Sequence, residues 1–270
     1  MGTALSTVLG NDFVLIRKNS RDFDASDFGK VREIVLESNA DIIINTVAFM
    51  GIDSCEADPE KAFNVNTLYP RLLAELSNET GSLLVNFSTD AVFNDAKKDF
   101  YLESDVPCPL NVYGMTKHGA DCFIQSIACK YYVCRISVLF GETQKNNQFV
   151  EKMVDRIRAG QKVIRVSDDI VFSPTYSRDA AAQVSQMLAG SYPWGIYHIA
   201  NEGKASLFDL MKEVVENMRL EVEIQRASFR DFPAKGIKNT FTPLCSEKIG
   251  ELRPWRDALK AYCEDFKKKI

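Results

Sequence analysis

The sequence from residue 83 to residue 90 reads Leu83-Leu84-Val85-Asn86-Phe87-Ser88-Thr89-Asp90, an apolar run that ends in polar residues. Comparable runs lie at 13–16, 42–44 and 131–136, and helical patterns separate them at about 28–38, 58–78 and 112–129. Near-continuous apolar strands that alternate with helices are typical of a parallel sheet covered on both faces. The pattern predicts a doubly wound α/β domain, which holds its ligands at the carboxyl ends of the strands.

The second half of the chain has a looser rhythm. Helical patterns lie near 147–159, 178–190, 206–217 and 254–268, and strand patterns near 162–166 and 220–224. We expect residues 1–140 to form a Rossmann-like dinucleotide-binding domain. We expect residues 141–270 to form a smaller α/β substrate-binding lobe, interleaved with the last elements of the first domain.

The beginning of the chain departs from the usual dinucleotide fold. Residues 1–6 read Met1-Gly2-Thr3-Ala4-Leu5-Ser6, the opening of a helix, whereas such folds begin with a strand and a glycine-rich loop. Gly2 fits the last glycine of that loop, where it would allow close packing of helix and strand. We therefore expect the first strand and the start of the loop to be missing through truncation; a fold that never had them is the alternative.

Composition narrows the class of protein. The formal net charge is -4 and the basic residues are scattered, which argues against nucleic acid or a membrane as a partner. No run approaches the ~20 apolar residues of a membrane span, and no secretory signal is evident. The seven cysteines have no CxxC spacing and are expected to be buried, reduced thiols. These features predict a soluble cytoplasmic protein.

The sharpest local motif is Asn111-Val112-Tyr113-Gly114-Met115-Thr116-Lys117. Tyr113 and Lys117 are four residues apart, so on a helix they share one face. A nearby ammonium favours the phenolate, so we expect Lys117 to lower the pKa of Tyr113 toward the working range. Alone, the spacing is a weak signal, and a surface helix turn with a solvated lysine explains it better. Thr89 and Asp90 follow a central strand, where ligands bind, although both are also common cap and turn residues.

Taken in order, the segments resemble the dTDP-4-dehydrorhamnose reductase family, within the extended short-chain dehydrogenases. The resemblance runs from Gly2 to about Trp255. It rests on segments that occur in the same order as in the family: residues 24–27, 45–49 with Asp53 and Glu56, 64–66, 88–93, 109–117, 135–137, 147–150, 173–175 and 197–200. It implies an NADP-dependent enzyme, with NAD as the other option, that reduces the 4-keto group of a nucleotide-diphosphate deoxysugar in sugar or polysaccharide precursor biosynthesis. A homodimer is compatible with it.

The family pattern also implies roles for matching residues. Thr89 would bond the sugar carbonyl oxygen, Tyr113 would supply a proton, and Lys117 would tune Tyr113 and hold the nicotinamide ribose. Tyr113 and Lys117 also belong to the implied cofactor-binding set, whose other members are Gly2, Arg17, Asp24, Ala48 and Asn66. Arg17 follows the expected second strand, where a basic residue can accept the 2′-phosphate of NADP, although a solvated strand end is the alternative. The implied substrate-binding residues are Asp90, Ala91, Val138, Asn147 and Thr175.

Several departures from the family pattern bear on the substrate. The family commonly has Tyr at the position of Ala91 and Trp at that of Val138, so we expect a differently shaped sugar pocket. Two alternatives stay open: an epimerase or dehydratase of the same superfamily, and a non-catalytic regulatory subunit with this fold. No His, Asp and Glu cluster has metal-ligand spacing, so no metal is expected.

Overall fold

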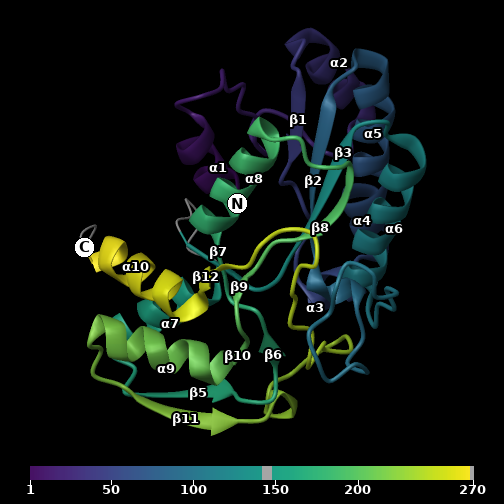
Figure 1. Ribbon diagram of the computed structural model, residues 1–270. Coiled ribbons are helices and arrows are strands. Elements are labelled where there is room, and N and C mark those ends of the chain that lie inside the picture. The colour runs from purple at the N-terminus through teal and green to yellow at the C-terminus, as the bar shows by residue number, and fades with distance from the viewer. Residues whose placement is uncertain (142–147, 268–270) are drawn as a thin grey trace.

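The computed structural model describes residues 1–141 and 148–267, and its centre is a parallel sheet of four strands (Figure 1). They are β1 (Ile42–Asn45), β2 (Leu83–Thr89), β3 (Tyr131–Ile136) and β8 (Gly195–His198), hydrogen-bonded in the order β1-β2-β3-β8. Leu83 lies opposite Ile42, and Tyr132 lies opposite Gly195. Because all four strands are parallel, their carboxyl ends meet at one edge of the sheet. The predicted α/β fold class is confirmed.

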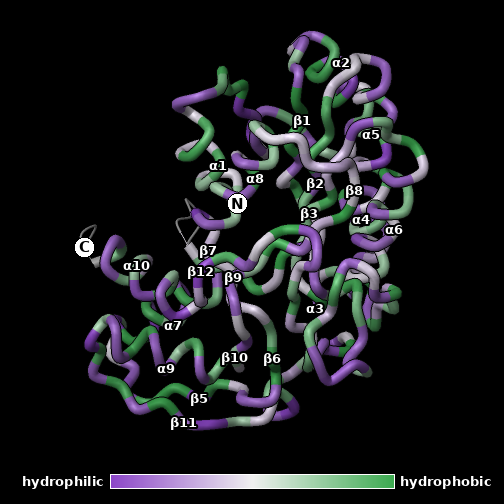
Figure 2. Tube along the Cα trace, viewed as in Figure 1, coloured by the Kyte–Doolittle hydropathy of each residue, from purple (hydrophilic) through white to green (hydrophobic). Residues whose placement is uncertain are grey.

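Helices cover both faces of this sheet, because alternate residues of each strand point to opposite sides. Leu84 and Val133 face α2 (Phe28–Ser38), α5 (Tyr69–Thr80) and α6 (Val112–Ile127). Val85 and Tyr132 face α1 (Gly2–Leu9) and α8 (Ser177–Ala189). The hydropathy colouring accordingly shows apolar strands inside helices of mixed character (Figure 2). Shorter helices connect β1 to α5: α3 (Ile52–Ala57), α4 (Pro59–Phe63) and a π-helical turn at Asn64–Leu68.

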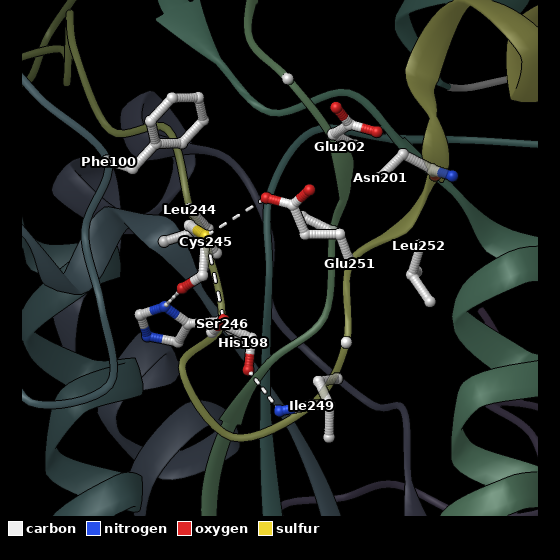
Figure 3. Close-up of a pocket in the computed structure, with 13 residues that line it drawn as sticks. Phe100, His198, Asn201, Glu202, Leu244, Cys245, Ser246, Ile249, Glu251 and Leu252 are labelled. Atoms are coloured by element: carbon white, nitrogen blue, oxygen red, sulfur yellow. Dashed lines mark hydrogen bonds between the residues drawn. The ribbon is translucent and has the colours of Figure 1, made fainter.

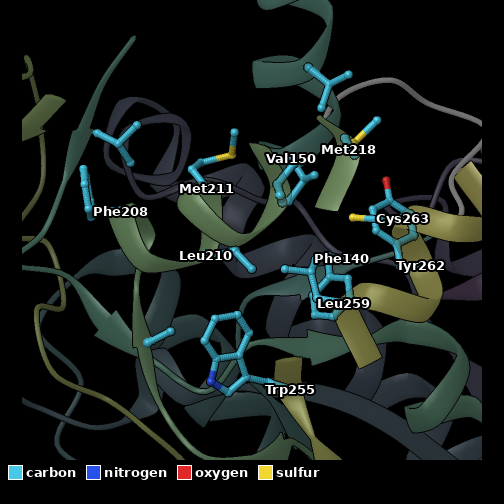
Figure 4. Packing of buried hydrophobic residues seen from close by; sticks show 14 of the residues in the cluster. Phe140, Val150, Phe208, Leu210, Met211, Met218, Trp255, Leu259, Tyr262 and Cys263 are labelled. Atoms are coloured by element: carbon cyan, nitrogen blue, oxygen red, sulfur yellow. The ribbon is translucent and has the colours of Figure 1, made fainter. Parts of the chain in front are cut away.

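A second lobe has its own apolar core (Figure 4). Its helices are α7 (Phe149–Arg158), α9 (Leu207–Met218) and α10 (Trp255–Lys267), and β5 (Val163–Ser167) pairs in parallel with β11 (Glu223–Ala227). Phe140, Leu210, Trp255 and Leu259 are buried together at its centre. Pairs of short strands join this lobe to the sheet domain: β4 (Leu139–Phe140) with β7 (Thr175–Tyr176), β6 (Val171–Phe172) with β10 (Ala205–Ser206), and β9 (Asn201–Glu202) with β12 (Leu252–Pro254).

Two predicted strands differ in the structure. The strand expected at 13–16 does not form: Val14 is 98% and Ile16 57% exposed, while Phe13 and Leu15 pack against the sheet-domain core. Burial of alternate residues does not require a strand, and β1, at the sheet edge, pairs only with β2 among the described residues. The strand expected at 220–224 forms at Glu223–Ala227, where its register with β5 is set.

The cysteines differ in part from the prediction. All seven cysteines are free, but only Cys55, Cys134 and Cys263 are buried; Cys108, Cys122 and Cys129 are exposed, contrary to the expectation of buried thiols.

Within residues 1–141 and 148–267, no helix combines the length and the apolar character that crossing a bilayer requires.

Candidate active site

The first turn of α6 is held against the end of β2. Asn111 is the N-cap of α6, and its side-chain oxygen accepts a hydrogen bond from Gly114 N at 2.9 Å. The Glu56 carboxylate accepts from Val112 N at 3.0 Å. Gly114 lies so close to the segment after β2 that a Cβ there would be 2.2 Å from the Ala91 carbonyl oxygen. This packing places Tyr113 beside Thr89.

The lysine of the motif is almost fully buried. Lys117 is 2% exposed, and its Nζ donates to the Phe87 carbonyl at 2.6 Å, near the carboxyl end of β2. Burial lowers the pKa of Lys117 to about 8, and the negative charge of Asp121 partly opposes this. Thr89, Tyr113 and Lys117 are thus brought to one place by β2 and α6.

The electrostatics of Tyr113 differ from the sequence-based expectation. Burial raises the pKa of Tyr113 to about 12; the Thr89 hydroxyl lowers it, and Asp90 and Cys55 raise it further. Lys117 is not among the groups that shift this pKa, and its ammonium donates to the Phe87 carbonyl. Desolvation is the largest cause, and Tyr113 carries its proton at neutral pH. A protonated phenol is the form that can act as an acid.

Asp90 lies in a cluster of hydroxyl groups. Its carboxylate accepts from Ser137 Oγ at 2.7 Å and from Thr89 and Thr242, both at 3.1 Å. Burial raises the pKa of Asp90, and these three donors work in the opposite direction. Asp90 thereby ties Thr89 to two segments outside β2.

Some of the expected cofactor residues lie near the carboxyl end of β1, and the others lie in the segment between α1 and α2. Gly2 lies at the carboxyl end of β1, where a Cβ would be 3.3 Å from Thr46 Oγ1, and Ala48 is half-buried in the same region. Asn66 is fully buried, and its amide bonds both the N–H (2.9 Å) and the carbonyl (3.0 Å) of Phe49, so it shapes this segment from behind. Arg17 and Asp24 are exposed, in the irregular segment between α1 and α2.

The expected substrate residues are not all brought together. Ala91 is buried beside the start of α6, and Val138 is half-buried against the core of the second lobe. Thr175 is 0% exposed and its hydroxyl donates to the Ser173 carbonyl at 3.1 Å, so it serves the β4–β7 junction. Asn147 lies outside the described residues.

Figure 3 shows a separate pocket near the end of β8. His198 is 1% exposed there, and its Nδ1 lies 3.0 Å from the carbonyl oxygens of both Tyr101 and Cys245. Burial lowers the pKa of His198 to about 4, with the Glu103 charge opposing, so the ring is neutral. Thr89, Tyr113 and Lys117 are not among the residues that line this pocket: Phe100, His198, Ala200, Asn201, Glu202, Gly203, Leu244, Cys245, Ser246, Ile249, Gly250, Glu251 and Leu252.

The residues that position the 111–117 motif were not predicted from the sequence. Asn111 was quoted only as part of the motif, although an Asn immediately before a helix is a common N-cap signal. Glu56 carries no local signal, because its contact with Val112 joins residues 56 positions apart. Among the part of the chain that the structure describes, no group of three His, Cys, Asp or Glu side chains is arranged to hold a metal ion.

Comparison with known proteins adds independent evidence. The family described as RmlD substrate binding domain matches residues 1–268. The spore coat polysaccharide biosynthesis protein SpsK of Bacillus subtilis is 30% identical, over 94% of this chain and 89% of its own. The dTDP-4-dehydrorhamnose reductase of Mycolicibacterium smegmatis is 32% identical, over 89% of this chain and 75% of its own. The crystal structure of the Bacillus anthracis dTDP-4-dehydrorhamnose reductase in complex with NADP superposes with a TM-score of 0.90, at 25% identity, over 97% of this chain and 95% of that one.

Proposed function

The chain belongs to the RmlD substrate-binding-domain family, that of the dTDP-4-dehydrorhamnose reductases, and on that premise we propose that it reduces the 4-keto group of a nucleotide-linked deoxysugar with NADPH. The chain is thus an NAD(P)-dependent nucleotide-sugar oxidoreductase. The observation that carries the specific reaction is the convergence of Thr89, Tyr113 and Lys117 at the carboxyl end of β2.

Two local features fit a dinucleotide on the sheet edge. The N-terminus of α1 lies at the end of β1, where its free N–H groups suit an anionic diphosphate. Gly2 is exposed and leaves the backbone accessible there. The ammonium of Lys117 uses one donor on Phe87 and has two others for the nicotinamide ribose. When bound, the nicotinamide supplies a hydride to the sugar C4.

The roles of the protein groups follow from their protonation. Tyr113 holds its proton at neutral pH and gives it to the oxygen at C4 as that oxygen gains negative charge, so the product is an alcohol. Thr89 aligns the same oxygen by turning its single hydroxyl proton to it from Asp90, to which that proton is donated here at 3.1 Å.

Arg17 is the proposed contact for the 2′-phosphate of NADP. It is exposed and follows α1 in the irregular segment, so its side chain is free to reach a phosphate at the sheet edge. Arg17→Ala should weaken NADPH binding much more than NADH binding, because only the former loses a charge-assisted contact. Isothermal titration with each cofactor measures this, and equal losses would remove Arg17 from the phosphate site.

The reaction is tested with a substrate panel. The purified chain is incubated with NADPH and dTDP-4-dehydrorhamnose, or with UDP- and GDP-linked 4-keto sugars, and NADPH oxidation is followed with NMR identification of the product. Because Ala91 and Val138 replace larger family residues, we expect a sugar other than the dTDP-linked one to react best. Turnover of the dTDP sugar in preference to the others would contradict that specificity.

Tyr113→Phe is the decisive variant, since it keeps the ring and removes the proton. Turnover should fall about 10²–10⁴-fold, with the melting temperature and NADPH affinity little changed. Near-normal turnover would exclude Tyr113 as the acid. Epimer or dehydration products without net NADPH oxidation would favour the epimerase or dehydratase alternative, and no turnover of any sugar would favour a regulatory subunit. Light scattering on the same samples reports whether a homodimer forms.

A further inference from the structure

A segment far along the chain is attached to the sheet domain by carboxylates. We call residues 235–247 the strap; it leads out of the second lobe and runs beside α3 toward the end of the sheet (Figure 1, yellow-green). Asp53, in α3, accepts from the strap at Lys235 N (2.9 Å), and its carboxylate pairs with Lys238 Nζ at 3.3 Å. The backbone N–H of Lys235 lowers the pKa of Asp53, so this carboxylate is charged at neutral pH.

Three more carboxylates repeat this arrangement along the strap. Asp95 accepts from Thr240 N (2.8 Å), Thr240 Oγ1 (2.6 Å) and Phe241 N (3.0 Å). Asp90 accepts from Thr242 Oγ1. Glu103 accepts from Ser246 Oγ (2.5 Å) and from the next backbone N–H (2.9 Å). Carboxyl side chains of the sheet domain thus hold the strap at four successive points.

The strap also contacts the N-cap of the helix that carries Tyr113. Asn111 Nδ2 donates to the Ile237 carbonyl and to Asn239 Oδ1, both at 2.9 Å, while the oxygen of the same amide caps Gly114 N. One planar amide therefore joins the strap to the first turn of α6. Without the strap, the Asn111 amide nitrogen loses both of its acceptors and only the bond from Gly114 N still orients the amide.

Helix α3 closes the connection from the other side. Its Asp53 holds the strap and its Glu56 holds Val112 N, three residues apart on one short helix. Gly236 packs directly on this helix: a Cβ there would be 2.6 Å from Ile52 Cγ2 and 2.7 Å from Glu56 Cγ. The strap, α3 and the start of α6 thus form a closed ring of contacts.

We propose that the strap is a positioning element of the active site, and that its docking on Asp53 and Asn111 fixes the first turn of α6 and, with it, Tyr113. The catalytic part of this inference rests on the proposed function, because Tyr113 matters for turnover only if it is the proton donor. The structural part does not depend on the substrate. Thr242, through Asp90, gives the strap a second connection, to Thr89.

Two variants each weaken the attachment of the strap at one point without altering α6 directly. Asp53→Ala removes the anchor on α3, and Asn239→Ala removes one partner of Asn111. A third, Asn111→Ser, keeps a side-chain acceptor for Gly114 N but has no amide to donate to the strap. The matched control is Asp231→Asn, which breaks an exposed ion pair with Arg165 just before the strap and touches neither α3 nor α6.

Hydrogen exchange resolved by NMR gives the structural readout, and trypsin cleavage after Lys235 and Lys238 gives a second. We expect each of the three variants, and not the control, to speed both strap exchange and cleavage at least tenfold. The amide of Gly114 should exchange faster as well, and kcat should fall about tenfold or more with the KM for NADPH unchanged. Faster strap cleavage with unchanged Gly114 exchange and unchanged kcat would overturn the proposal.

Failure of the proposed function and failure of the positioning role of the strap give different results. If Tyr113→Phe keeps its turnover, the proposed function is wrong, while Gly114 exchange in Asp53→Ala still decides whether the strap positions α6. If Tyr113→Phe loses turnover but none of the three variants changes Gly114 exchange, the reaction stands and the positioning role is excluded.

Discussion

Arg135 Nε lies 3.1 Å from Asp121 Oδ2, and the two side chains are 1% and 0% exposed. The pair joins β3 to α6 one helix turn after Lys117, and the Arg135 guanidinium also lies over the Phe93 ring at 5.2 Å. Asp121 raises the pKa of Lys117 against the effect of burial. One buried carboxylate thus interacts with two cations.

Removing the cation of this pair should be costly. Arg135→Met leaves the Asp121 charge buried without its partner, and we expect a loss of about 3–5 kcal/mol in the free energy of unfolding. Arg32→Met is the control: its ion pair with Glu79 is about half exposed, so a loss of no more than about 1 kcal/mol is expected. Urea unfolding of both variants measures this. Comparable small losses would mean that the buried pair does not stabilise the fold.

The pKa of Lys117 makes a prediction about pH. In the folded protein it is lowered to about 8, below the ordinary 10.5. Between these values the unfolded chain binds more protons, so the penalty for burying this lysine disappears as pH rises. The stability of the wild type relative to Lys117→Met should therefore increase from pH 7 to pH 10.

The control for this experiment is Lys130→Met. Lys130 Nζ also donates to a backbone carbonyl, that of Gly81 at 3.2 Å, but it is exposed. Urea unfolding at pH 7, 8, 9 and 10 should show a constant difference between this variant and the wild type. A constant difference for Lys117→Met as well would show that Lys117 keeps its ordinary proton affinity in the folded protein.

Gly114 and Gly29 should respond oppositely to the same substitution. A Cβ at Gly114 would be 2.2 Å from the Ala91 carbonyl oxygen, so Gly114→Ala must push α6 away from β2, at a cost of about 1–3 kcal/mol and with loss of turnover. In α2, a Cβ at Gly29 would be 3.5 Å from its nearest neighbour, so Gly29→Ala should stabilise by about 0.4–1 kcal/mol. Thermal melts and initial rates test both, and a silent Gly114→Ala would contradict the close approach.

A buried carboxyl group in the second lobe predicts a stabilising variant. Tyr262 Oη donates to Glu151 Oε1 at 2.6 Å, Glu151 is 4% exposed, and burial raises its pKa. When a carboxyl group has a raised pKa in the folded state, the folded protein loses stability as pH rises from the ordinary pKa through the raised one. Glu151→Gln keeps an acceptor for Tyr262 without the charge, so it should raise the melting temperature more at pH 8 than at pH 5. The exposed Glu221→Gln should change neither, and an equal change at both pH values would contradict a buried charge.

The helices and buried strands that show a clear hydrophobic pattern were predicted from the sequence. Helix α2 begins and ends where its pattern does, at Phe28 and Ser38, and the apolar runs of β1, β2 and β3 were recognised because strands buried on both faces are almost wholly apolar. The run at 13–16 failed because its apolar residues indicate burial, while a strand also needs a hydrogen-bonded neighbour. A local sequence pattern indicates burial, but it does not show whether a neighbouring strand is present.

The site shows the same division. Spacing within one helix placed Tyr113 and Lys117 together, but the engagement of Lys117 with Phe87 depends on how α6 lies across β2. The strap contacts join residues more than 120 positions apart, such as Asn111 and Ile237, and no local motif encodes them. Thr175 followed a family motif, yet its environment in the fold is a buried strand junction.

The packing of α1 on α8 sets an order of events during synthesis. The apolar face of α1, with Ala4, Leu5 and Leu9, is covered by Ala180, Val184 and other residues of α8. Ribosomes add about 5–20 residues per second, so residues 2–9 wait on the order of ten seconds before their covering helix exists. The last strand of the sheet, β8, emerges later still. The nascent chain therefore exposes an apolar helix and an open sheet edge until residue 198 has been made, and chaperone binding in this interval would protect both surfaces.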